Sequence, residues 1–222
     1  GLIEDIRIQE EKGKLSQVRA LQAQINPHFI FNAMDMVNWL ALSRGCDDIA
    51  EIVSSIASLM RYSITEADSM VPVALELENI REFISIYQLR HNSRPVLQTD
   101  IHGETVLIPK FTLQPLVENA VRHARPLPEQ ELRIEIHAWA EQERTLIEVH
   151  DNGMGCNADE LNRHLRYEET SLQISSGFGI RNVNERITLR FGSASGLVYQ
   201  NETDGSLTAR ITLCASQPEG TQ

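Results

Sequence analysis

Three short segments in the second half of the chain carry residues that could together bind a nucleotide. Asp151-Asn152-Gly153-Met154-Gly155 directly follows an apolar, strand-like run at 146–150. A carboxylate beside two glycines can accept a hydrogen bond from an exocyclic amine while the backbone closes on a flat ring. A second glycine pair, in Gly177-Phe178-Gly179-Ile180, precedes a helical pattern. Backbone N–H groups at the start of a helix can hold phosphates.

The third segment is Glu118-Asn119, upstream of the other two and within a helical pattern at 112–124. The side-chain carbonyl of an asparagine is an oxygen ligand of the kind that Mg²⁺ accepts. Each segment alone is weak evidence for a nucleotide site. Asp-Asn-Gly is also a common tight turn, and an asparagine on a helix is usually solvated. Three such segments in this order, each on a plausible element, predict an ATP site.

These segments resemble the conserved boxes of the GHKL ATPases, a superfamily that includes histidine kinases, gyrase and MutL. Leu113–His123 resembles the N box, Asp151–Gly155 the G1 box and Gly177–Asn182 the G2 box. The residue sequence of the N box is similar to that of the LytS/YesM class of bacterial sensor histidine kinases. The resemblance covers nearly the whole chain, from about residue 15 to residue 214.

The resemblance implies a role for each residue of the first and third segments. Asp151 would accept a hydrogen bond from the adenine amine, as a carboxylate reads an amino donor on a base edge. Gly153 and Gly155 would let the backbone approach the ring. Asn119 would hold Mg²⁺ between the phosphates, with Glu118 as its neighbouring partner.

Two basic residues one turn beyond Asn119 are further candidates. Arg122 and His123 could face the phosphates. The alternative is a solvent-facing arginine and a packed histidine, and the residues alone favour neither interpretation.

The second glycine pair would hold the β- and γ-phosphates through the residues around the helix start, Gly177, Phe178, Gly179 and Ile180. The stretch 156–176 is mostly polar and lacks strong periodicity past Leu165. It is expected to form a mobile lid over the nucleotide or a plain loop. Arg166 and Arg181 are candidates to neutralise phosphate charge.

A histidine far upstream stands in Asn26-Pro27-His28-Phe29-Ile30-Phe31-Asn32, which resembles the phosphoacceptor segment of the class. A neutral imidazole is a competent nucleophile near neutral pH. Without an ATP site, a histidine packed beside a helix start would be the better interpretation; with one, His28 is predicted to accept the phosphoryl group. Asn32, one turn on, either orients a water for dephosphorylation of the partner or is a plain surface amide. Phe29 stands where many other histidine kinases have an acidic residue.

The first part of the chain predicts a helical hairpin. One long helix is expected from about residue 2 to residue 44, followed by a stop at Gly45 and a second amphipathic helix with apolar residues from Ile49 to Met60. Each hairpin has more apolar surface than it can hide alone. We therefore expect two copies to form a homodimeric four-helix bundle.

The remainder predicts an α/β sandwich with a mixed sheet, as in GHKL domains, so the fold class is α+β. Strands are expected at 96–101, 105–108, 132–140, 145–150, 196–201 and 206–214, and helices at 112–124 and 180–191. The predicted domains are a dimerisation and phosphoacceptor hairpin (1–68), a linker helix (69–94), an ATP-binding domain (95–216) and a polar tail (217–222).

Composition narrows the function classes. A net charge of −11 disfavours a nucleic-acid partner, which would require a basic face. Three cysteines, Cys46, Cys156 and Cys214, are widely spaced and fit a reducing compartment better than a disulfide framework or a zinc site. The chain has no apolar run near the ~20 residues that a membrane helix requires.

The resemblance implies autophosphorylation of His28 by Mg-ATP and transfer to an aspartate of a response-regulator receiver domain. Transfer within one chain and across the dimer are both compatible with the residues. Family members usually carry membrane helices and a sensor upstream, so a cytoplasmic portion of a bacterial membrane sensor is expected. The first alternative is an ATP-driven conformational switch that phosphorylates no histidine. A dimeric helical adaptor with an inactive nucleotide fold is disfavoured, because Asn119 and Asp151 are both present.

Overall fold

The computed structural model describes residues 27–64, 69–91, 95–102, 106–127, 130–141, 143–170 and 178–214. The chain divides into two compact units, Gly1–Met60 and Arg61–Gln222. The expected helix at 2–26 lies outside the described residues. Helix α3 runs from the first unit into the second, so its last turn belongs to the second unit.

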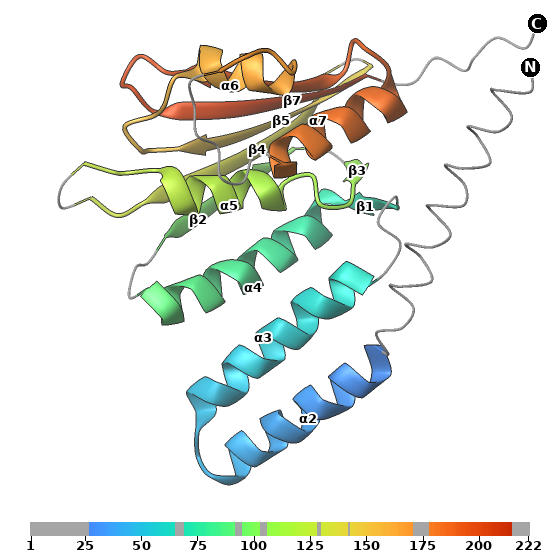
Figure 1. Cartoon of the computed structure of the whole chain (residues 1–222), viewed down its shortest axis with the longest axis vertical. Coiled ribbons are helices and arrows are strands. Elements are labelled where there is room, and N and C mark those ends of the chain that lie inside the picture. The colour runs from blue at the N-terminus through green and yellow to red at the C-terminus, as the bar shows by residue number, and fades with distance from the viewer. Residues whose placement is uncertain are drawn as a thin grey trace, which may run out of the picture. The chain divides into compact units, whose positions relative to one another are not determined.

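The first unit contains a helical hairpin, as the sequence predicts (Figure 1). Helix α2 spans Pro27–Ser43, and its first residue is a proline, whose fixed φ suits the start of a helix. Gly45 ends the helix with φ +69°, a left-handed conformation that glycine adopts without a Cβ clash. Helix α3 spans Asp47–Ile64, and Asp47 and Asp48 place negative charge in its first turn.

The second unit is built on a five-stranded sheet in the order β2-β4-β5-β7-β6. β2 runs parallel to β4 and all other neighbours are antiparallel, which confirms the predicted mixed sheet. The strands are β2 (Val96–Ile101), β4 (Arg133–Glu141), β5 (Arg144–Asp151), β6 (Gly196–Asn201) and β7 (Leu207–Cys214).

Alternation along the strands gives the sheet one buried face and one wet face. On β4, Ile134, Ile136 and Ala138 are fully buried. On the wet face, Arg210 of β7 forms an ion pair with Glu148 of β5. Helices α5 (Gln114–His123), α6 (Ala158–Leu165) and α7 (Phe178–Phe191) pack on the buried face (Figure 1). The result is the predicted two-layer α/β sandwich.

Helix α4 spans Val73–His91 and packs against α5, with Leu77, Ile80 and Ile84 in the core. A small two-stranded sheet pairs β1 (Met70–Pro72) with β3 (Leu107–Pro109). β3 overlaps the strand expected at 105–108, whereas β1 was not predicted, because a three-residue strand is too short to show alternation.

Part of the predicted lid segment is helical: α6 occupies eight of its residues. Asn157 caps this helix by accepting a hydrogen bond from the Glu160 N–H at 3.2 Å. Asp159 and Glu160 lie in its first turn, and Ala158 and Leu165 are buried. Residues 171–177 of the predicted lid lie outside the described residues.

Candidate nucleotide-binding site

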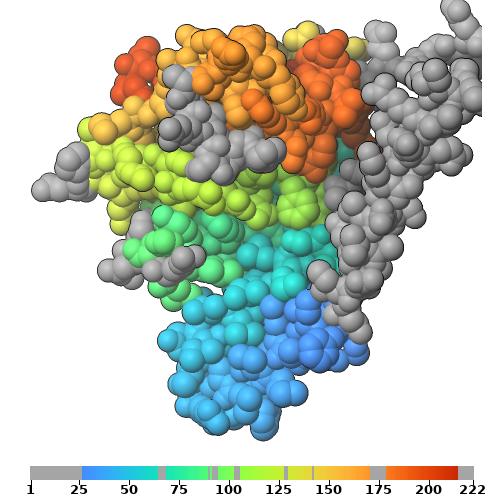
Figure 2. Space-filling view, in the orientation of Figure 1, coloured from blue at the N-terminus to red at the C-terminus, as the bar shows by residue number. Residues whose placement is uncertain are grey.

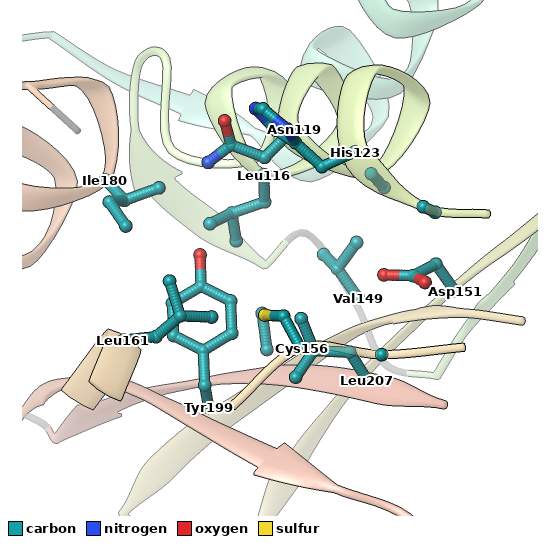
Figure 3. Close-up of a pocket in the computed structure, with 14 residues that line it drawn as sticks. Leu116, Asn119, His123, Val149, Asp151, Cys156, Leu161, Ile180, Tyr199 and Leu207 are labelled. Carbon is teal, nitrogen blue, oxygen red and sulfur yellow. The ribbon is translucent and has the colours of Figure 1, made fainter. Parts of the chain in front are cut away.

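A cavity lies between α5 and the buried face of the sheet (Figure 3). Asp151 lies at one end of it and Ile180 at the other. Asn119 and His123 approach from α5, and Tyr199 approaches from β6. The walls between them are mostly apolar, formed by Leu116, Ala120, Val149, Leu161, Leu207 and Ala209. A slot with apolar walls and a few convergent polar groups is typical of a small-ligand site.

Among the described residues that line this cavity, Asp151 is the only one with an acidic side chain. It is 7% exposed, at the end of β5. Burial raises the pKa of its carboxyl group, and the Gly153 N–H, which donates to Oδ1 at 3.0 Å, partly offsets that effect. A buried carboxylate with acceptor capacity left is suited to bind an amine donor of a ligand.

The two glycines after Asp151 allow the chain to pass close to other backbone. A Cβ at Gly153 would lie 2.9 Å from the Cβ of Ala124, at the end of α5. Gly155 has φ +67°, and a side chain there would collide with the carbonyl of Gly205 in the β6–β7 turn. The Met154 N–H donates to the Arg125 carbonyl at 2.9 Å, which attaches this segment to the end of α5.

Asn152 has a structural role. Its Oδ1 accepts from the Arg133 N–H at 2.7 Å, and its Nδ2 donates to the Glu131 carbonyl at 3.0 Å. These two bonds hold the turn after β5 against the start of β4. Both ends of the side-chain amide therefore bind the protein backbone, and Asn152 is not among the residues that line the cavity.

Asn119 and Tyr199 meet inside the cavity. The Tyr199 hydroxyl points from β6 toward the Asn119 amide (Figure 3). Burial raises the pKa of Tyr199, so the hydroxyl is neutral at physiological pH. Asn162 of α6 fixes the Tyr199 backbone, accepting from its N–H and donating to its carbonyl, both at 2.8 Å.

The other polar residues predicted on α5 divide into two groups. His123 lines the cavity, and its pKa is lowered by burial and by the nearby Arg122 and Arg125 charges. Glu118 and Arg122 do not line it. The Glu118 carboxylate accepts from Gln114 Nε2 at 2.8 Å, one turn earlier on the same helix.

The second glycine segment meets the cavity at the start of α7. Ile180 lines the cavity, whereas Gly179 lies near Pro115 at the start of α5. Gly177 and the side chain of Phe178 lie outside the described residues. The helix N-terminus is thus at the end of the cavity opposite Asp151 (Figure 3), the arrangement that suits a ligand with an amine at one end and phosphates at the other.

The two arginines suggested for phosphate binding are engaged elsewhere. Arg181 donates from Nε to the His164 carbonyl at 2.8 Å, and its guanidinium lies 4.5 Å from the centre of the Tyr167 ring. Arg166 pairs with Glu168 at 2.7 Å on the surface. In this conformation both contact the α6 region.

His28 and Asn32 lie in the first turns of α2, in the first unit. Both are exposed, and the Asn32 amide nitrogen lies 3.3 Å from His28 Nδ1. The neighbouring Phe29 is 71% exposed.

The donor set of the cavity fits ATP and Mg²⁺. Asp151 offers an acceptor for the adenine amine, and the apolar walls suit the flat ring. No cluster of three His, Cys, Asp or Glu side chains exists among the described residues. Mg²⁺ does not require one, because it commonly binds one or two protein oxygens and takes its other ligands from phosphates and water. Asn119 can supply such an oxygen.

Tyr199, Asn162 and Asn201 contribute to the site without having been predicted. Asn201 donates to the Cys156 carbonyl at 2.7 Å and accepts from the Ala158 N–H at 3.0 Å, which shapes the wall after the glycines. Alternation on β6 buries Leu197 and Tyr199, and that pattern would have placed Tyr199 on the inner face. No local sequence pattern marks Asn162 or Asn201 as a residue of the site.

Comparison with protein families gives two matches that together cover most of the chain. The "Histidine kinase" family matches residues 16–95. The family described as "Histidine kinase-, DNA gyrase B-, and HSP90-like ATPase" matches residues 108–218, which include the whole cavity described above. Among the described residues, no helix is both long enough and apolar enough to span a membrane.

Curated relatives are longer than this chain. It is 35% identical to the sensor histidine kinase YesM of Bacillus subtilis, over 90% of this chain and 33% of that protein. It is 31% identical to the sensor protein LytS of Bacillus anthracis, over 85% of this chain and 32% of the relative. The chain therefore spans about a third of their length.

Solved structures share the fold. The catalytic domain of histidine kinase ThkA matches 68% of this chain and 97% of its own, with a TM-score of 0.51 and 11% identity. The Acinetobacter baumannii histidine kinase AdeS matches 86% of this chain and 96% of its own, with a TM-score of 0.51 and 12% identity.

Proposed function

We propose that this chain, which belongs to the histidine kinase family and within it to the LytS/YesM class of sensor kinases, binds Mg-ATP in the cavity beneath α5 and transfers the γ-phosphoryl group to His28. Membership of the family supports a kinase role in two-component signalling. The observation that carries the ATP site is the buried Asp151 carboxylate, in the same cavity as Asn119 and the start of α7.

Different residues along the cavity contact different parts of the nucleotide. Asp151 accepts a hydrogen bond from the adenine amine. Gly153 and Gly155 let the backbone lie close to the ring. At the opposite end, the N–H groups at the start of α7, around Gly179 and Ile180, receive phosphate oxygens. Asn119 would supply an oxygen ligand to Mg²⁺, and the bound metal would offset the charge of the phosphates.

His28 acts as the nucleophile. A ring nitrogen lone pair forms the new N–P bond while the bond between the γ-phosphorus and its bridging oxygen breaks, and ADP leaves with that electron pair. The Asn32 amide nitrogen lies 3.3 Å from His28 Nδ1, which keeps Asn32 the candidate to orient a water for dephosphorylation of the partner.

The partners follow from the family and from the hairpin. Two copies form a homodimer through the apolar faces of α2 and α3. The phosphoryl group passes from His28 to an aspartate of a response-regulator receiver domain. In the full-length protein the chain is the cytoplasmic portion beyond a membrane sensor, consistent with relatives three times as long.

Labelling with γ-³²P-ATP and Mg²⁺ tests the proposal. The wild-type chain is expected to incorporate acid-labile, base-stable label, and His28→Ala is expected to lose it. His102→Ala, which removes another exposed histidine, is the matched control and should keep the label.

An Asn119→Ala variant tests the proposed metal ligand. It is expected to lose both Mg-dependent ATP binding and labelling. Tight Mg-ATP binding by the wild-type chain without any label on His28, even with full-length protein, would instead favour the nucleotide-driven switch.

A further inference from the structure

A second group of buried charges lies outside the nucleotide cavity. Glu76 of α4 is 1% exposed and Lys110, at the end of the small sheet, is 0% exposed. Charged side chains are almost never fully buried unless they are paired and hydrogen-bonded. The phosphoryl-transfer chemistry described above uses neither residue, so their burial requires another explanation.

The Glu76 carboxylate binds the turn that leads into α5. Its Oε1 accepts from the Phe111 N–H at 2.6 Å, and its Oε2 accepts from the Leu113 N–H at 3.0 Å. Phe111 has φ +58°, an unfavourable conformation for a residue with a Cβ. The carboxylate therefore holds a strained turn in place by binding both of its outward N–H groups.

The same turn is bound from the other side by α7. Arg186 donates from one terminal nitrogen to the Lys110 carbonyl at 2.7 Å and from the other to the Phe111 carbonyl at 2.8 Å. Helix α5 carries Asn119, and α7 begins at the phosphate end of the cavity. One turn thus fixes the positions of both helices.

The last turn of α3 also contacts the Glu76 carboxylate. Tyr62 lies in the last turn of α3, within the second unit, and its hydroxyl donates to Glu76 Oε1. Lys110 Nζ donates to the Tyr62 carbonyl and lies 4.4 Å from the centre of the Tyr62 ring. The ring of Phe111 packs edge-on against Tyr62, with 5.0 Å between ring centres.

We propose that Glu76 is a positioning residue for the nucleotide site: it fixes the turn at 110–113, and through that turn the distance between Asn119 on α5 and the phosphate-binding start of α7. This role rests on the proposed function of the cavity. Tyr62 makes the position of the turn depend on the end of α3, the helix that continues from the phosphoacceptor hairpin.

Glu76→Gln tests the proposal, with Glu78→Gln as the matched control. Both variants remove one negative charge from the same helix, but Glu78 is exposed. The glutamine at 76 has one acceptor oxygen, so one of the two turn N–H groups loses its partner. The affinity for a fluorescent N-methylanthraniloyl ATP, measured with Mg²⁺, is expected to fall about 10-fold, because hydrogen bonds to charged groups are among the stronger ones. Glu78→Gln should stay within about 2-fold of wild type.

Amide exchange gives a readout that general destabilisation would not produce. The Phe111 and Leu113 amides are expected to exchange faster in Glu76→Gln while buried amides of β4 and β5 stay protected. A folded Glu76→Gln variant with wild-type affinity and wild-type exchange at these two amides would overturn the proposal.

Tyr62→Phe keeps the test decisive if Glu76→Gln fails to fold. It removes one donor and leaves both backbone bonds, so a loss of affinity of about 3-fold is expected. An unchanged affinity would contradict the role of the cluster. Failure of the wild-type chain to bind nucleotide would count against the proposed function instead, and the exchange at Phe111 and Leu113 would still report on the turn.

Discussion

The hairpin and the nucleotide domain bury their side chains in different ways. In the domain, the fully buried positions include large aliphatic residues such as Ile80, Ile108, Ile136, Ile147 and Ile211. In the described part of the hairpin, the buried hydrophobic residues before the last turn of α3 are alanines, Ala41, Ala50 and Ala57. Several large apolar residues of α2, among them Met36, Trp39 and Leu42, are more than half exposed; the hairpin is the blue to cyan region in Figure 2.

This difference indicates which unit is complete. A domain with its aliphatic side chains inside can fold by itself, because burial of apolar area is the main favourable term. In the described residues, the hairpin packs on alanines and leaves tryptophan and leucine exposed, a surface that favours a covering partner. The family, the hairpin pattern and this exposure together favour a second copy of the chain as the cover.

The largest expected effect lies in the domain core. Ile147→Ala, at a fully buried position in the central strand β5, should lower the free energy of unfolding by about 2–5 kcal/mol through lost burial and a cavity. Urea unfolding followed by circular dichroism measures it. Ile49→Ala on α3, where the side chain is 46% exposed, is the contrast. Equal losses of unfolding free energy in the two variants, measured on a monomeric sample, would contradict the difference in side-chain burial between the two units.

The next effect concerns association through the hairpin. Trp39→Ser should weaken the dimer by about 10–100-fold, because large aromatic residues dominate interface energies. Sedimentation equilibrium measures the dissociation constant. Leu189→Ser, which removes an 86% exposed apolar side chain on α7, should leave association unchanged. A wild-type chain that is monomeric at every concentration would reject the dimer.

Asp151→Asn should have opposite effects on binding and stability. Nucleotide affinity should fall about 10-fold, because the amide accepts a weaker hydrogen bond than the carboxylate. Burial raises the pKa of Asp151, so the folded domain prefers the protonated form and the ionised form costs stability at neutral pH. The nucleotide-free variant should therefore melt at a higher temperature than wild type at pH 7.

Lowering the pH should reduce that difference in melting temperature. As the pH falls through the folded-state pKa toward the unfolded-state value, wild type binds the proton and gains the stability that the variant already has. Differential scanning calorimetry across this range measures the change. If Asp151→Asn melts at a lower temperature than wild type at pH 7, the protein stabilises the ionised Asp151 carboxylate and the prediction is wrong.

The smallest expected effect is at Tyr199. Tyr199→Phe removes the hydroxyl that faces the Asn119 amide, and the Mg²⁺ dependence of nucleotide binding should shift about 3-fold to higher metal concentration. Binding measured without metal should change little. The control is Tyr87→Phe, whose hydroxyl donates to the Val121 carbonyl on the same helix at 3.4 Å. Equal shifts in both variants would attribute the effect to α5 as a whole.

Regular periodicity is what made most of the fold predictable from the sequence. β2 and β6 occur at their predicted bounds, and α5, β4, β5 and α7 lie within two residues of theirs. The eight-residue α6 was missed, since a short, polar helix that begins with an asparagine cap has too few turns to show a stripe.

The site was predicted where residue type alone carries the chemistry. Asp151, Asn119, His123, Gly155 and Ile180 do line one cavity. Their roles stay predictions. Contacts between residues distant in sequence could not be predicted. Neither the hydrogen bond from Phe111 to Glu76 nor the hydrogen bonds between Asn162 and the Tyr199 backbone produce a local sequence pattern.

The close approach of Gly155 to the Gly205 carbonyl limits how this protein can be engineered. The β6–β7 turn is a surface turn containing Asp204 and Gly205, of the kind that normally accepts an inserted tag or reporter domain. Here the inner side of that turn lies against the glycine segment at the Asp151 end of the cavity, where the adenine is proposed to bind. An insertion at 203–205 would thus act on nucleotide binding, whereas the β4–β5 turn, at the other end of β5, offers a site remote from it.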